Sequence, residues 1–404
     1  MQTQLPESLL RTPVGQEADR ILRACVHCGF CTATCPTYQE LGDELDGPRG
    51  RIYQIKHVLE GAQATRQVQR HLDRCLTCLN CTTTCPSGVD YGRLVDIGRA
   101  YVDERVERPL RERLMRWGLR QILPYPERFG PLLRLGQLVR PLAPKALRAK
   151  IPAPAARSEA RIGSHARKII LHQGCVQPSL TPATDAAAMR VLDRLGIEAV
   201  RTGGGCCGAV SQHLNAPAEA RDFMRRNIDA WWPHIEAGAE AVLVTASGCG
   251  VMVKDYGHLL RDDPVYAERA ARVSELARDL CELLSADDLA GLDSRAPRRI
   301  AFHAPCTLQH GQKLPGRTEA LLRAAGFELV PVHDAHSCCG SAGTYSILQA
   351  DLSQRLLVKK LDALQDGGPM LIATANVGCQ THLQTDAAVP VVHWIELFDP
   401  ERAW

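Results

Sequence analysis

The cysteines of this sequence are the residues whose number and spacing point most directly to chemistry. There are 17 of them among 404 residues, and eight fall into two runs near the N-terminus. The first run comprises Cys25, Cys28, Cys31 and Cys35, and the second comprises Cys75, Cys78, Cys81 and Cys85. Each run has the spacing C-x2-C-x2-C-x3-C followed by proline, and each position of the second lies 50 residues after its counterpart. Closely spaced cysteines in a chain that is not secreted are typical of metal ligands.

The triple run that ends in Cys-Pro is the ligand pattern of bacterial ferredoxins. In that pattern the first three cysteines of a run bind one [4Fe–4S] cluster, and the fourth binds the other. We therefore predict two clusters with crossed ligands. The predicted sets are Cys25, Cys28, Cys31 and Cys85 for cluster 1, and Cys75, Cys78, Cys81 and Cys35 for cluster 2. Structural zinc also accepts four thiolates, but its sites pair two C-x2-C turns, so the spacing favours iron–sulfur clusters.

The elements around these runs are expected to be helical. Pro36 and Pro86 turn the chain away after the fourth cysteine of each run. Residues 42–61 between the runs predict a loop followed by an amphipathic helix. Arg49 and Arg51 lie in this segment, where solvated surface arginines are favoured over arginines docked against a cluster.

A second cysteine pattern repeats in the C-terminal half. Its first copy comprises Cys175, Cys206, Cys207 and Cys249, and its second comprises Cys306, Cys338, Cys339 and Cys379. Because the intervals between copies are 130 to 132 residues, a duplication is the simplest account. These eight cysteines are candidate ligands of one or two further clusters. The alternative is that one or both copies keep the fold without the metal. Cys281 lies outside the pattern, in a predicted helical run over residues 273–284, and is expected to pack in the core.

Both copies alternate short apolar runs with helical stretches. The strands expected are 168–172, 197–200 and 241–245 in the first copy, and 298–303, 327–332 and 370–375 in the second. This alternation predicts a βαβαβ unit with a parallel sheet in each copy. Every cysteine of the pattern would then follow the carboxyl end of a strand, where such sheets place their sites. Two copies facing each other would bring both cysteine sets towards one cleft.

No cofactor fingerprint other than the cysteines is evident. The glycines at 203–205 and 208 match no phosphate-binding motif, so no flavin or nucleotide is expected on this chain. The histidines near cysteines are His27, His172, His303, His310, His333 and His336, and none is assigned to metal. His303 and His336 are instead candidate donors that tune a cluster's potential.

Composition and charge narrow the setting of the protein. The N-terminal sequence resembles no secretory signal, and no apolar stretch is long enough to span a membrane, so we expect a cytoplasmic chain. Residues 106–166 form a basic, proline-broken connector. It predicts short amphipathic helices that lie on the inner face of the membrane, dock a partner or pack on the chain itself. No nucleic-acid module accompanies the basic charge, so a nucleic-acid partner is not expected.

The cysteine-rich copies resemble the CCG domains of the heterodisulfide reductase B subunit family. The full order resembles the iron–sulfur subunits of glycolate oxidase (glycolate dehydrogenase) and of anaerobic glycerol-3-phosphate dehydrogenase. The segments that carry the resemblance to the glycolate oxidase subunits are ILRACVHCGFCTATCPTY, GDELDGPRGRIY, HLDRCLTCLNCTTTCPSG, NIDAWWPHIEAGAEA, TASGCG, CTLQHGQKL, CCGSAGTY and VGCQTHL. One departure is that CCG domains end in C-x-x-C, whereas Met252 and His382 stand at the last position here.

The resemblance implies an α+β chain of several domains. They are a helical ferredoxin domain (1–105), the basic connector (106–166) and two duplicated α/β CCG domains (167–296 and 297–404). It also implies an electron-transfer subunit that works with an FAD-containing glycolate-oxidising subunit and a further flavoprotein-like subunit, and that passes electrons to quinone or another acceptor. The alternatives are a subunit for glycerol 3-phosphate or lactate oxidation, a thiol–disulfide reductase like the heterodisulfide enzymes, and a zinc scaffold without redox activity.

Overall fold

The structure is a computed structural model that describes residues 1–142, 144, 151–154 and 159–404. Parts of the predicted connector, residues 143, 145–150 and 155–158, lie outside the described residues. Contacts divide the chain into two units, which are described separately. The first comprises Met1–Trp117 and His336–Lys360, and the second comprises Gly118–Ala335 and Leu361–Trp404.

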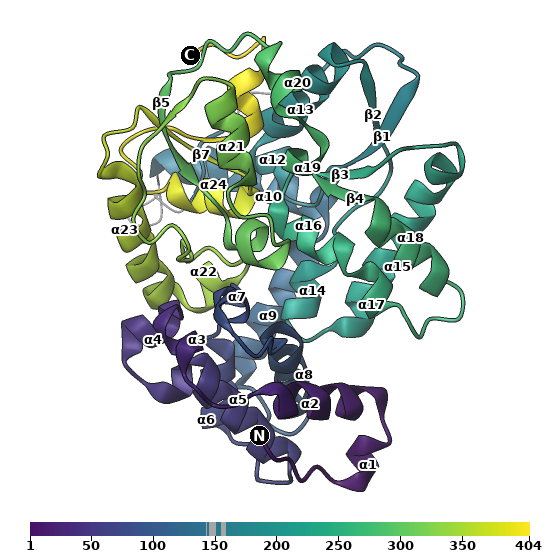
Figure 1. Ribbon diagram of the computed structural model, residues 1–404, viewed down its shortest axis with the longest axis vertical. Coiled ribbons are helices and arrows are strands. Elements are labelled where there is room, and N and C mark those ends of the chain that lie inside the picture. Colours follow the sequence, from purple (N-terminus) through teal and green to yellow (C-terminus); the bar gives the residue numbers. More distant parts are fainter. Residues whose placement is uncertain (143, 145–150, 155–158) are drawn as a thin grey trace. The chain divides into compact units, whose positions relative to one another are not determined.

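The first unit is helical in its described residues, as the sequence predicts for the segment that carries the ferredoxin runs (Figure 1). Its helices are α1 (Glu7–Leu10), α2 (Pro13–Ala24), α3 (Phe30–Ala33), α4 (Pro36–Leu41), η1 (Glu44–Asp46), α5 (Pro48–Leu59), α6 (Arg66–Asp73), α7 (Asn80–Thr84), α8 (Tyr91–Asp103), most of α9 (Leu110–Ile122), α22 (Tyr345–Leu348) and the start of α23 (Ala350–Gln365). Prolines occupy the first position of α2, α4 and α5, where the missing N–H costs no helical hydrogen bond.

The apolar core of this unit holds the cysteine runs in place. Ile21, Leu22, Ile55, Leu59 and Leu94 are each at most 1% exposed and pack α2, α5 and α8 together. The first cysteine of each run lies directly after a helix of this core, α2 or α6, and belongs to the same apolar cluster. The loops that follow therefore start from rigid helix ends.

The second unit contains two four-stranded parallel sheets, with strand orders β2-β1-β3-β4 and β6-β5-β7-β8. The strands are β1 (Arg167–His172), β2 (Ile197–Arg201), β3 (Val242–Val244) and β4 (Ala277–Asp279), then β5 (Arg299–His303), β6 (Glu328–Leu329), β7 (Leu371–Thr374) and β8 (Val391–His393). The predicted βαβαβ units are present. The sequence missed β4 and β8, which add a fourth strand to each sheet. The helical run predicted around Cys281 is wrong in part, because β4 interrupts it.

Helices cover the faces of both sheets (Figure 1). Besides the ends of α9 and α23, the described helices of this unit are α10 (Pro126–Val139), η2 (Arg140–Leu142), α12 (Gln177–Leu180), α13 (Pro182–Arg194), α14 (Ala209–His213), α15 (Pro217–Glu236), α16 (Ser247–Lys254), α17 (Tyr256–Leu259), α18 (Ala267–Leu276), α19 (Leu280–Leu283), α20 (Ala286–Ala290), η3 (Thr307–Gly311), α21 (Arg317–Ala324), α24 (Val377–Leu383) and η4 (Trp394–Phe398). Cys281 is fully buried in the main apolar cluster, which confirms its predicted place in the core.

The two repeats of the second unit share one core and several polar contacts. Residues of both sheets, among them Leu171 and Leu371, belong to a single apolar cluster. A buried ion pair joins Arg190 Nη2 of α13 to Asp399 Oδ2 at 2.5 Å. At the carboxyl ends of β3 and β7, Asn376 Nδ2 donates to Ser247 Oγ at 3.2 Å. The sheets are therefore fixed to each other by packing and by polar side chains.

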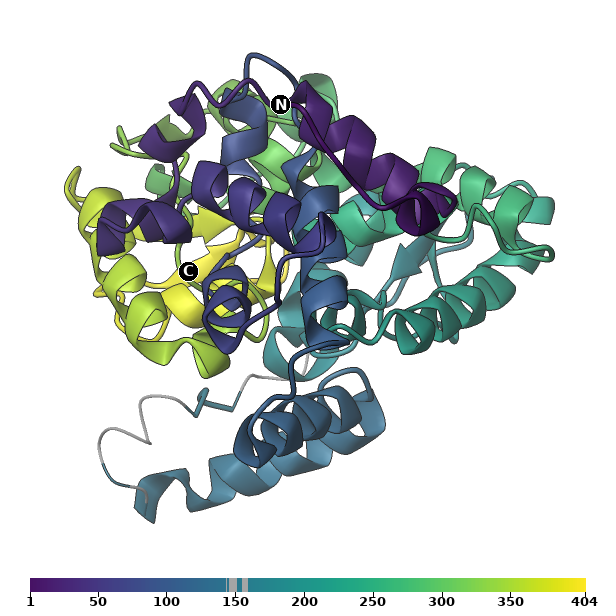
Figure 2. The same cartoon turned by 90° about the horizontal axis from the view of Figure 1, so that it is seen from below.

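The described part of the connector exposes nine large apolar side chains. The consecutive helices α9 and α10 are blue in Figure 2. Of all their residues, Gly130 alone is buried. The large hydrophobic residues exposed here are Leu110, Leu114, Met115, Trp117, Leu132, Leu135, Leu138, Val139 and Leu142. Among the described residues no helix has the length and apolar character needed to cross a membrane.

Candidate metal centres

Two cavities in the first unit are lined by the cysteines of the ferredoxin runs. The first cavity is lined by Cys25, Cys28, Cys31 and Cys85, together with Cys81. The second is lined by Cys35, Cys75, Cys78 and Cys81. Each cavity thus collects three cysteines of one run and the fourth cysteine of the other, which is the grouping that the crossed-ligand prediction requires. Cys81 and Tyr91 line both cavities, so the two sites are neighbours.

The electrostatics of the thiols follow the same grouping, except that Cys31 of the other set also raises the pKa of Cys81. Burial, and then the proximity of Cys25, raise the pKa of Cys31 to about 11, and Cys85 and Cys28 also raise it. Burial raises the pKa of Cys81 well above its usual range, and Cys75 and Cys35 raise it further. Thiolates that repel one another in a buried site need a cationic partner, because thiolates are the form that binds metal. The donor set therefore fits iron–sulfur clusters.

The backbone between the ligands adopts left-handed conformations at matching positions in both runs. In the first run φ is 59° at His27 and 87° at Gly29, and in the second it is 53° at Thr77 and 61° at Leu79. This geometry is strained for residues other than glycine. Loops of this kind turn successive N–H groups towards an anion, and the Thr77 N–H donates to Cys75 Sγ at 3.4 Å. The sequence did not reveal this strain, because glycine, the residue that signals a left-handed backbone, occurs at Gly29 but not at the other three positions.

An approximate two-fold relation connects the two runs. Thr34 Oγ1 and Thr84 Oγ1 lie 3.1 Å apart, and these residues are separated by the same 50 positions as the cysteines. The short helices α3 and α7, which precede the fourth cysteines, pack against each other. A residue that contacts its own counterpart lies close to the symmetry axis. Thr34 and Thr84 each precede a fourth cysteine, so the two fourth cysteines start near this axis and extend to opposite cavities.

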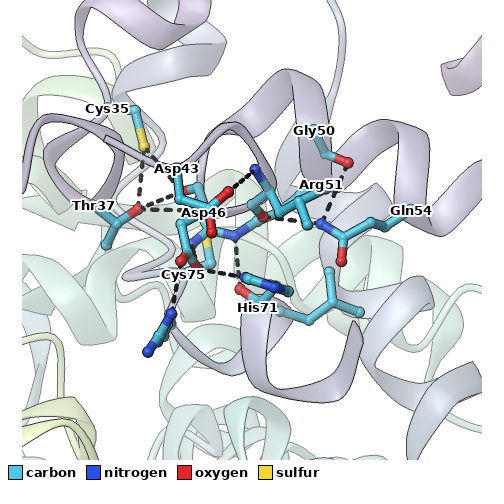
Figure 3. Close-up of polar contacts among 12 residues, drawn as sticks. Cys35, Thr37, Asp43, Asp46, Gly50, Arg51, Gln54, His71 and Cys75 are labelled. Carbon is cyan, nitrogen blue, oxygen red and sulfur yellow. Dashed lines mark hydrogen bonds and ion pairs between the residues drawn. The ribbon is translucent and has the colours of Figure 1, made fainter. Parts of the chain in front are cut away.

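Arg51 lines the second cavity and is 1% exposed. The prediction of a solvated surface arginine is therefore wrong at this position. Its guanidinium donates to His71 O at 2.8 Å and to Thr37 Oγ1 at 3.1 Å, and lies 3.4 Å from Asp46 Oδ1 (Figure 3). Arg74 Nη1 pairs with Asp46 Oδ2 at 2.7 Å. The buried carboxylate is what allows this arginine to be buried, since a buried charge needs a hydrogen-bonded partner.

The arginines act on the thiol of Cys75. Burial opposes its ionisation, but Arg51 and Arg99 outweigh burial and lower the pKa of the Cys75 thiol. Arg99 also donates to Cys75 O at 2.7 Å and to Thr77 Oγ1 at 2.9 Å, which secures the second loop. The Tyr91 hydroxyl lies 3.6 Å from Cys75 Sγ and donates to it. The second cavity is therefore a buried site with fixed positive charge.

The first cavity is more open. Its arginine, Arg49, keeps 35% of its side chain exposed and pairs with the partly exposed Glu44 at 2.6 Å. Cys28 is exposed, and the neighbouring Val26 is 66% exposed. Arg49 is thus partly exposed but also lines the cysteine cavity, so the prediction of a solvated surface arginine is confirmed only in part.

In the first repeat of the second unit, the four predicted cysteines converge beyond the ends of the strands. Hydrogen bonds between thiols link Cys175 to Cys206, Cys206 to Cys207, and Cys207 to Cys249. The hydrogen bond with Cys206 lowers the pKa of Cys207, but Cys249 and burial outweigh it and raise this pKa well above its usual range. Gly208 follows with φ of 94°, and a Cβ there would lie 2.9 Å from Ala220 O, so only glycine fits the turn. Four thiols in mutual contact form a second kind of candidate centre.

His172, the last residue of β1, joins this group, although the sequence assigned it no role in metal binding. A ring nitrogen of His172 and the sulfurs of Cys207 and Cys249 all lie within 4.8 Å of one another. Burial lowers the pKa of His172 to about 4, so the imidazole is neutral at physiological pH. The only signal in the sequence was its position three residues before Cys175.

The cysteines of the second repeat divide between the two units. Cys306 and Cys379 follow β5 and β7 in the second unit, whereas Cys338 and Cys339 belong to the first. The turn at Gly340 has φ of 89°, and its N–H donates to Cys338 Sγ at 3.4 Å. The corresponding turn of the first repeat donates from Gly208 N–H to Cys206 Sγ at the same distance. The CCG turns of both repeats are therefore built alike.

Comparison with known proteins assigns the cysteines to two kinds of domain. A profile of the 4Fe–4S dicluster domain matches residues 21–89, and a profile of the cysteine-rich CCG domain matches residues 169–254 and 300–384. The chain is thus an iron–sulfur protein that combines a dicluster domain with two CCG domains. It is 56% identical over 401 residues to the glycolate oxidase iron–sulfur subunit of Escherichia coli K12, covering 99% of this chain and 98% of that one. The chain belongs to the family of glycolate oxidase iron–sulfur subunits.

More distant relatives extend the comparison. The probable glycolate oxidase iron–sulfur subunit of Bacillus subtilis 168 is 30% identical, over 88% of this chain and 86% of that one. Lactate utilization protein A of an Exiguobacterium species is 27% identical, over 57% of this chain and 96% of that one. A crystal structure of a hypothetical Helicobacter pylori protein gives a TM-score of 0.55 at 8% identity, over 98% of this chain and 76% of that one. The last likeness concerns the fold alone.

Proposed function

We propose that this chain is the electron-transfer subunit of a glycolate dehydrogenase and holds two [4Fe–4S] clusters on its ferredoxin cysteines. Cys25, Cys28, Cys31 and Cys85 would hold cluster 1, and Cys75, Cys78, Cys81 and Cys35 would hold cluster 2. The observation that carries the proposal is the pair of adjoining cavities, each lined by three thiols of one run and the fourth of the other. When bound, such clusters accept and release single electrons.

The residues around the cavities suit a relay. The loop at Thr77 presents a backbone N–H group to Cys75 Sγ, and the loop at His27 has the matching left-handed backbone. Arg51 and Arg99 place fixed positive charge beside Cys75, which favours the more negatively charged, reduced state of the second centre. The exposed Cys28 makes the first centre the point of exchange with a partner. The second cavity would then be the better electron acceptor of the two.

The partner that delivers electrons is, in this proposal, an FAD-containing subunit that oxidises glycolate to glyoxylate. A further flavoprotein-like subunit would complete the complex, and quinone is the proposed acceptor. The exposed apolar residues of α9 and α10 are proposed to contact a partner subunit. Co-sedimentation with anionic vesicles, lost at high salt, would instead assign this surface to the inner face of the membrane.

Related oxidations are the second candidate. The similarity to lactate utilization protein A favours lactate as the substrate to compare with glycolate. A thiol–disulfide reductase is disfavoured, because Met252 and His382 replace the last cysteine of each CCG pattern.

We propose the domain limits 1–105, 106–166, 167–296 and 297–404 for designing truncated variants.

The test begins with anaerobic purification and a count of iron and sulfide per chain. About eight of each is expected from the two ferredoxin clusters, and about twelve or sixteen if the CCG cysteines add one or two more. The chain is then mixed with the FAD-containing subunit proposed as its partner, and cluster reduction is followed by absorbance with glycolate, lactate or glycerol 3-phosphate. Reduction of the clusters by glycolate, but not by lactate or glycerol 3-phosphate, supports the proposal. Zinc without iron, or reduction only by another substrate, overturns it.

A further inference from the structure

The two ferredoxin cavities are bordered by residues at matching positions, but these residues are exposed at one cavity and buried at the other. Val26 and Phe30 belong to the loop of the first run, and Leu76 and Asn80 stand 50 positions later in the loop of the second. Val26 is 66% exposed and Phe30 62%, whereas Leu76 is 7% exposed and Asn80 2%. The duplication therefore keeps the positions and reverses their burial.

The prolines that end the two runs show the same contrast. Pro86 lines the first cavity and is exposed, while Pro36 lines the second and is buried. Cys28, which lines the first cavity, is exposed as well. The exposed residues around the first cavity thus come from both runs. We refer to four of them as the open rim, namely Val26, Cys28, Phe30 and Pro86.

The second run is covered by another segment of its own unit. Asn80 Nδ2 donates to Thr34 O at 3.0 Å and to His336 O at 3.3 Å. The Tyr345 hydroxyl donates to Arg74 O at 3.1 Å, just before the first cysteine of the second run. His336 and Tyr345 both belong to the first unit. The polar side chain of Asn80 is therefore used to hold the chain's own backbone against the second loop.

We propose that the open rim is the docking surface of a flavin-carrying electron donor that presents an apolar face. This inference rests on the proposed function and specifies where its donor contacts the chain. Electron tunnelling falls steeply with distance, so a donor must approach a cluster ligand that reaches the surface, as Cys28 does. Phe30 stands where Asn80 stands in the second run, and complete burial of a phenylalanine side chain contributes about 1.5–3 kcal/mol. Electron-transfer encounters bury small areas, which suits a rim of this size.

The charge around the rim indicates how the donor is recognised. Among the described residues that line the first cavity, Arg49 is the one side chain with a permanent charge, and its Nε pairs with Glu44 Oε1 at 2.6 Å. The side chains at the rim therefore offer no excess charge to steer an oppositely charged donor. Steering by charge depends strongly on salt, whereas apolar contact does not. The rate of electron delivery should therefore change little with ionic strength.

The experiment uses the full-length chain, purified anaerobically, and the FAD-containing subunit reduced by light instead of by substrate. Val26→Ser and Phe30→Ser are compared with Val265→Ser, because Val265 is 67% exposed in the second unit and matches Val26 in type and exposure. Stopped-flow absorbance gives the second-order rate constant of cluster reduction. Dithionite, a small reductant that needs no docking surface, is the second donor. Iron per chain shows that each variant is loaded.

Phe30→Ser should lower the rate constant with the FAD-containing subunit at least about tenfold, and Val26→Ser should lower it by a smaller factor. Val265→Ser should match the wild-type chain, and dithionite should reduce every variant at the wild-type rate. Wild-type rates in both rim variants, a light-reduced subunit that does not reduce the wild-type chain, or loss of transfer at high salt overturns the proposal. A wild-type chain that dimerises through Phe30 overturns it in favour of self-association.

Glycolate as the electron source separates this inference from the proposed function. If glycolate does not reduce the wild-type chain through the FAD-containing subunit, the substrate assignment fails. The docking surface still stands in that case if Phe30→Ser slows transfer from the light-reduced subunit.

Discussion

The protein contains two internal duplications, and in each the copies agree in their cysteines and differ in what surrounds them. The ferredoxin runs keep one spacing, yet the second cavity is lined by the buried Arg51 and the first by the partly exposed Arg49. In the first CCG repeat the buried Gln177 and Thr245 hydrogen-bond each other at 2.6 Å, whereas Leu308 and Ala375 stand at the corresponding positions of the second. The spacing of the cysteines determines which metal group can bind. The surrounding side chains determine the cluster potential, the stability and the pH dependence of each copy.

The largest effect is expected from breaking the crossed assignment of the fourth cysteines. Cys85→Ala should lose the cluster that Cys28→Ala loses, and Cys35→Ala should lose the one that Cys78→Ala loses, because these pairs line the same cavities. Each variant should fall from about eight to about four irons per chain. Electron paramagnetic resonance of the reduced proteins identifies which signal disappears. If Cys85→Ala instead matches Cys78→Ala, each run binds its own cluster and the crossing is wrong.

The difference between the two arginines should give the next largest effect. Arg51→Gln leaves the carboxylate of Asp46 buried with one cation fewer, which should cost about 3–5 kcal/mol of stability. The potential of the second cluster should also become more negative, because positive charge beside Cys75 is lost. Arg49→Gln, which breaks a partly exposed pair with Glu44, should cost less than about 1 kcal/mol. Chemical denaturation measures the change in stability, and redox titration measures the change in the potential of the second cluster.

Equal losses of stability in Arg51→Gln and Arg49→Gln would contradict this comparison, because they would mean that the burial of Arg51 adds nothing to the stability of the fold. A potential that does not move in Arg51→Gln, with both clusters present, would show that its charge is screened from the second cavity. Arg51→Lys separates charge from geometry. It keeps the positive charge but cannot reach His71 O and Thr37 Oγ1 together as the guanidinium does.

In the CCG repeats the corresponding contrast is a pH dependence confined to the first copy. Burial raises the pKa of Asp185 to about 7, although Thr245 and Gln177 donate hydrogen bonds to its carboxyl group. The native chain therefore keeps a proton between about pH 4 and 7 that the unfolded chain has released, so stability falls as pH rises through this window and levels off above it. The total loss should be at most about 4 kcal/mol.

Asp185→Asn should reduce this dependence, because the amide does not titrate, and should leave the smaller dependence that comes from Asp279, whose pKa burial raises to about 6. Urea denaturation at pH 5 and pH 8, followed by tryptophan fluorescence, gives the difference in stability for each variant. Asp193→Asn is the control, since hydrogen bonds from His165 and Gly163 lower the pKa of Asp193 and its contribution changes in the opposite sense at lower pH. A slope in Asp185→Asn equal to that of the wild-type chain would assign the dependence to another group.

The sheets could be predicted from the sequence because they follow from regularly spaced apolar runs, and the ligand sets are a prediction of the same kind from the regular spacing of the cysteines. A 50-residue repeat of cysteines and alternating apolar runs are visible without a structure. The sequence did not predict the burial of Arg51, which requires Asp46, Thr37 and the carbonyl of His71 to converge from other helices. Strands of three residues such as β4 and β8 carry no periodicity of their own. The place of His172 among thiols depends on the order of β1, β2 and β3, which follows only from the fold.

The smallest effect concerns a single hydrogen bond between the two cavities. Tyr91→Phe removes the hydroxyl that donates to Cys75 Sγ at 3.6 Å and keeps the ring that lines both sites. A hydrogen bond contributes about 0.5–1.5 kcal/mol, which corresponds to roughly 20–60 mV for one electron. Because donors to sulfur stabilise the reduced cluster, the second potential should become more negative by about this amount while the first stays constant. Tyr53→Phe, at an exposed tyrosine that packs against the rings of His27 and His57, should shift neither potential. A shift of the first potential instead would place the influence of Tyr91 in the other cavity and reverse the contrast between them.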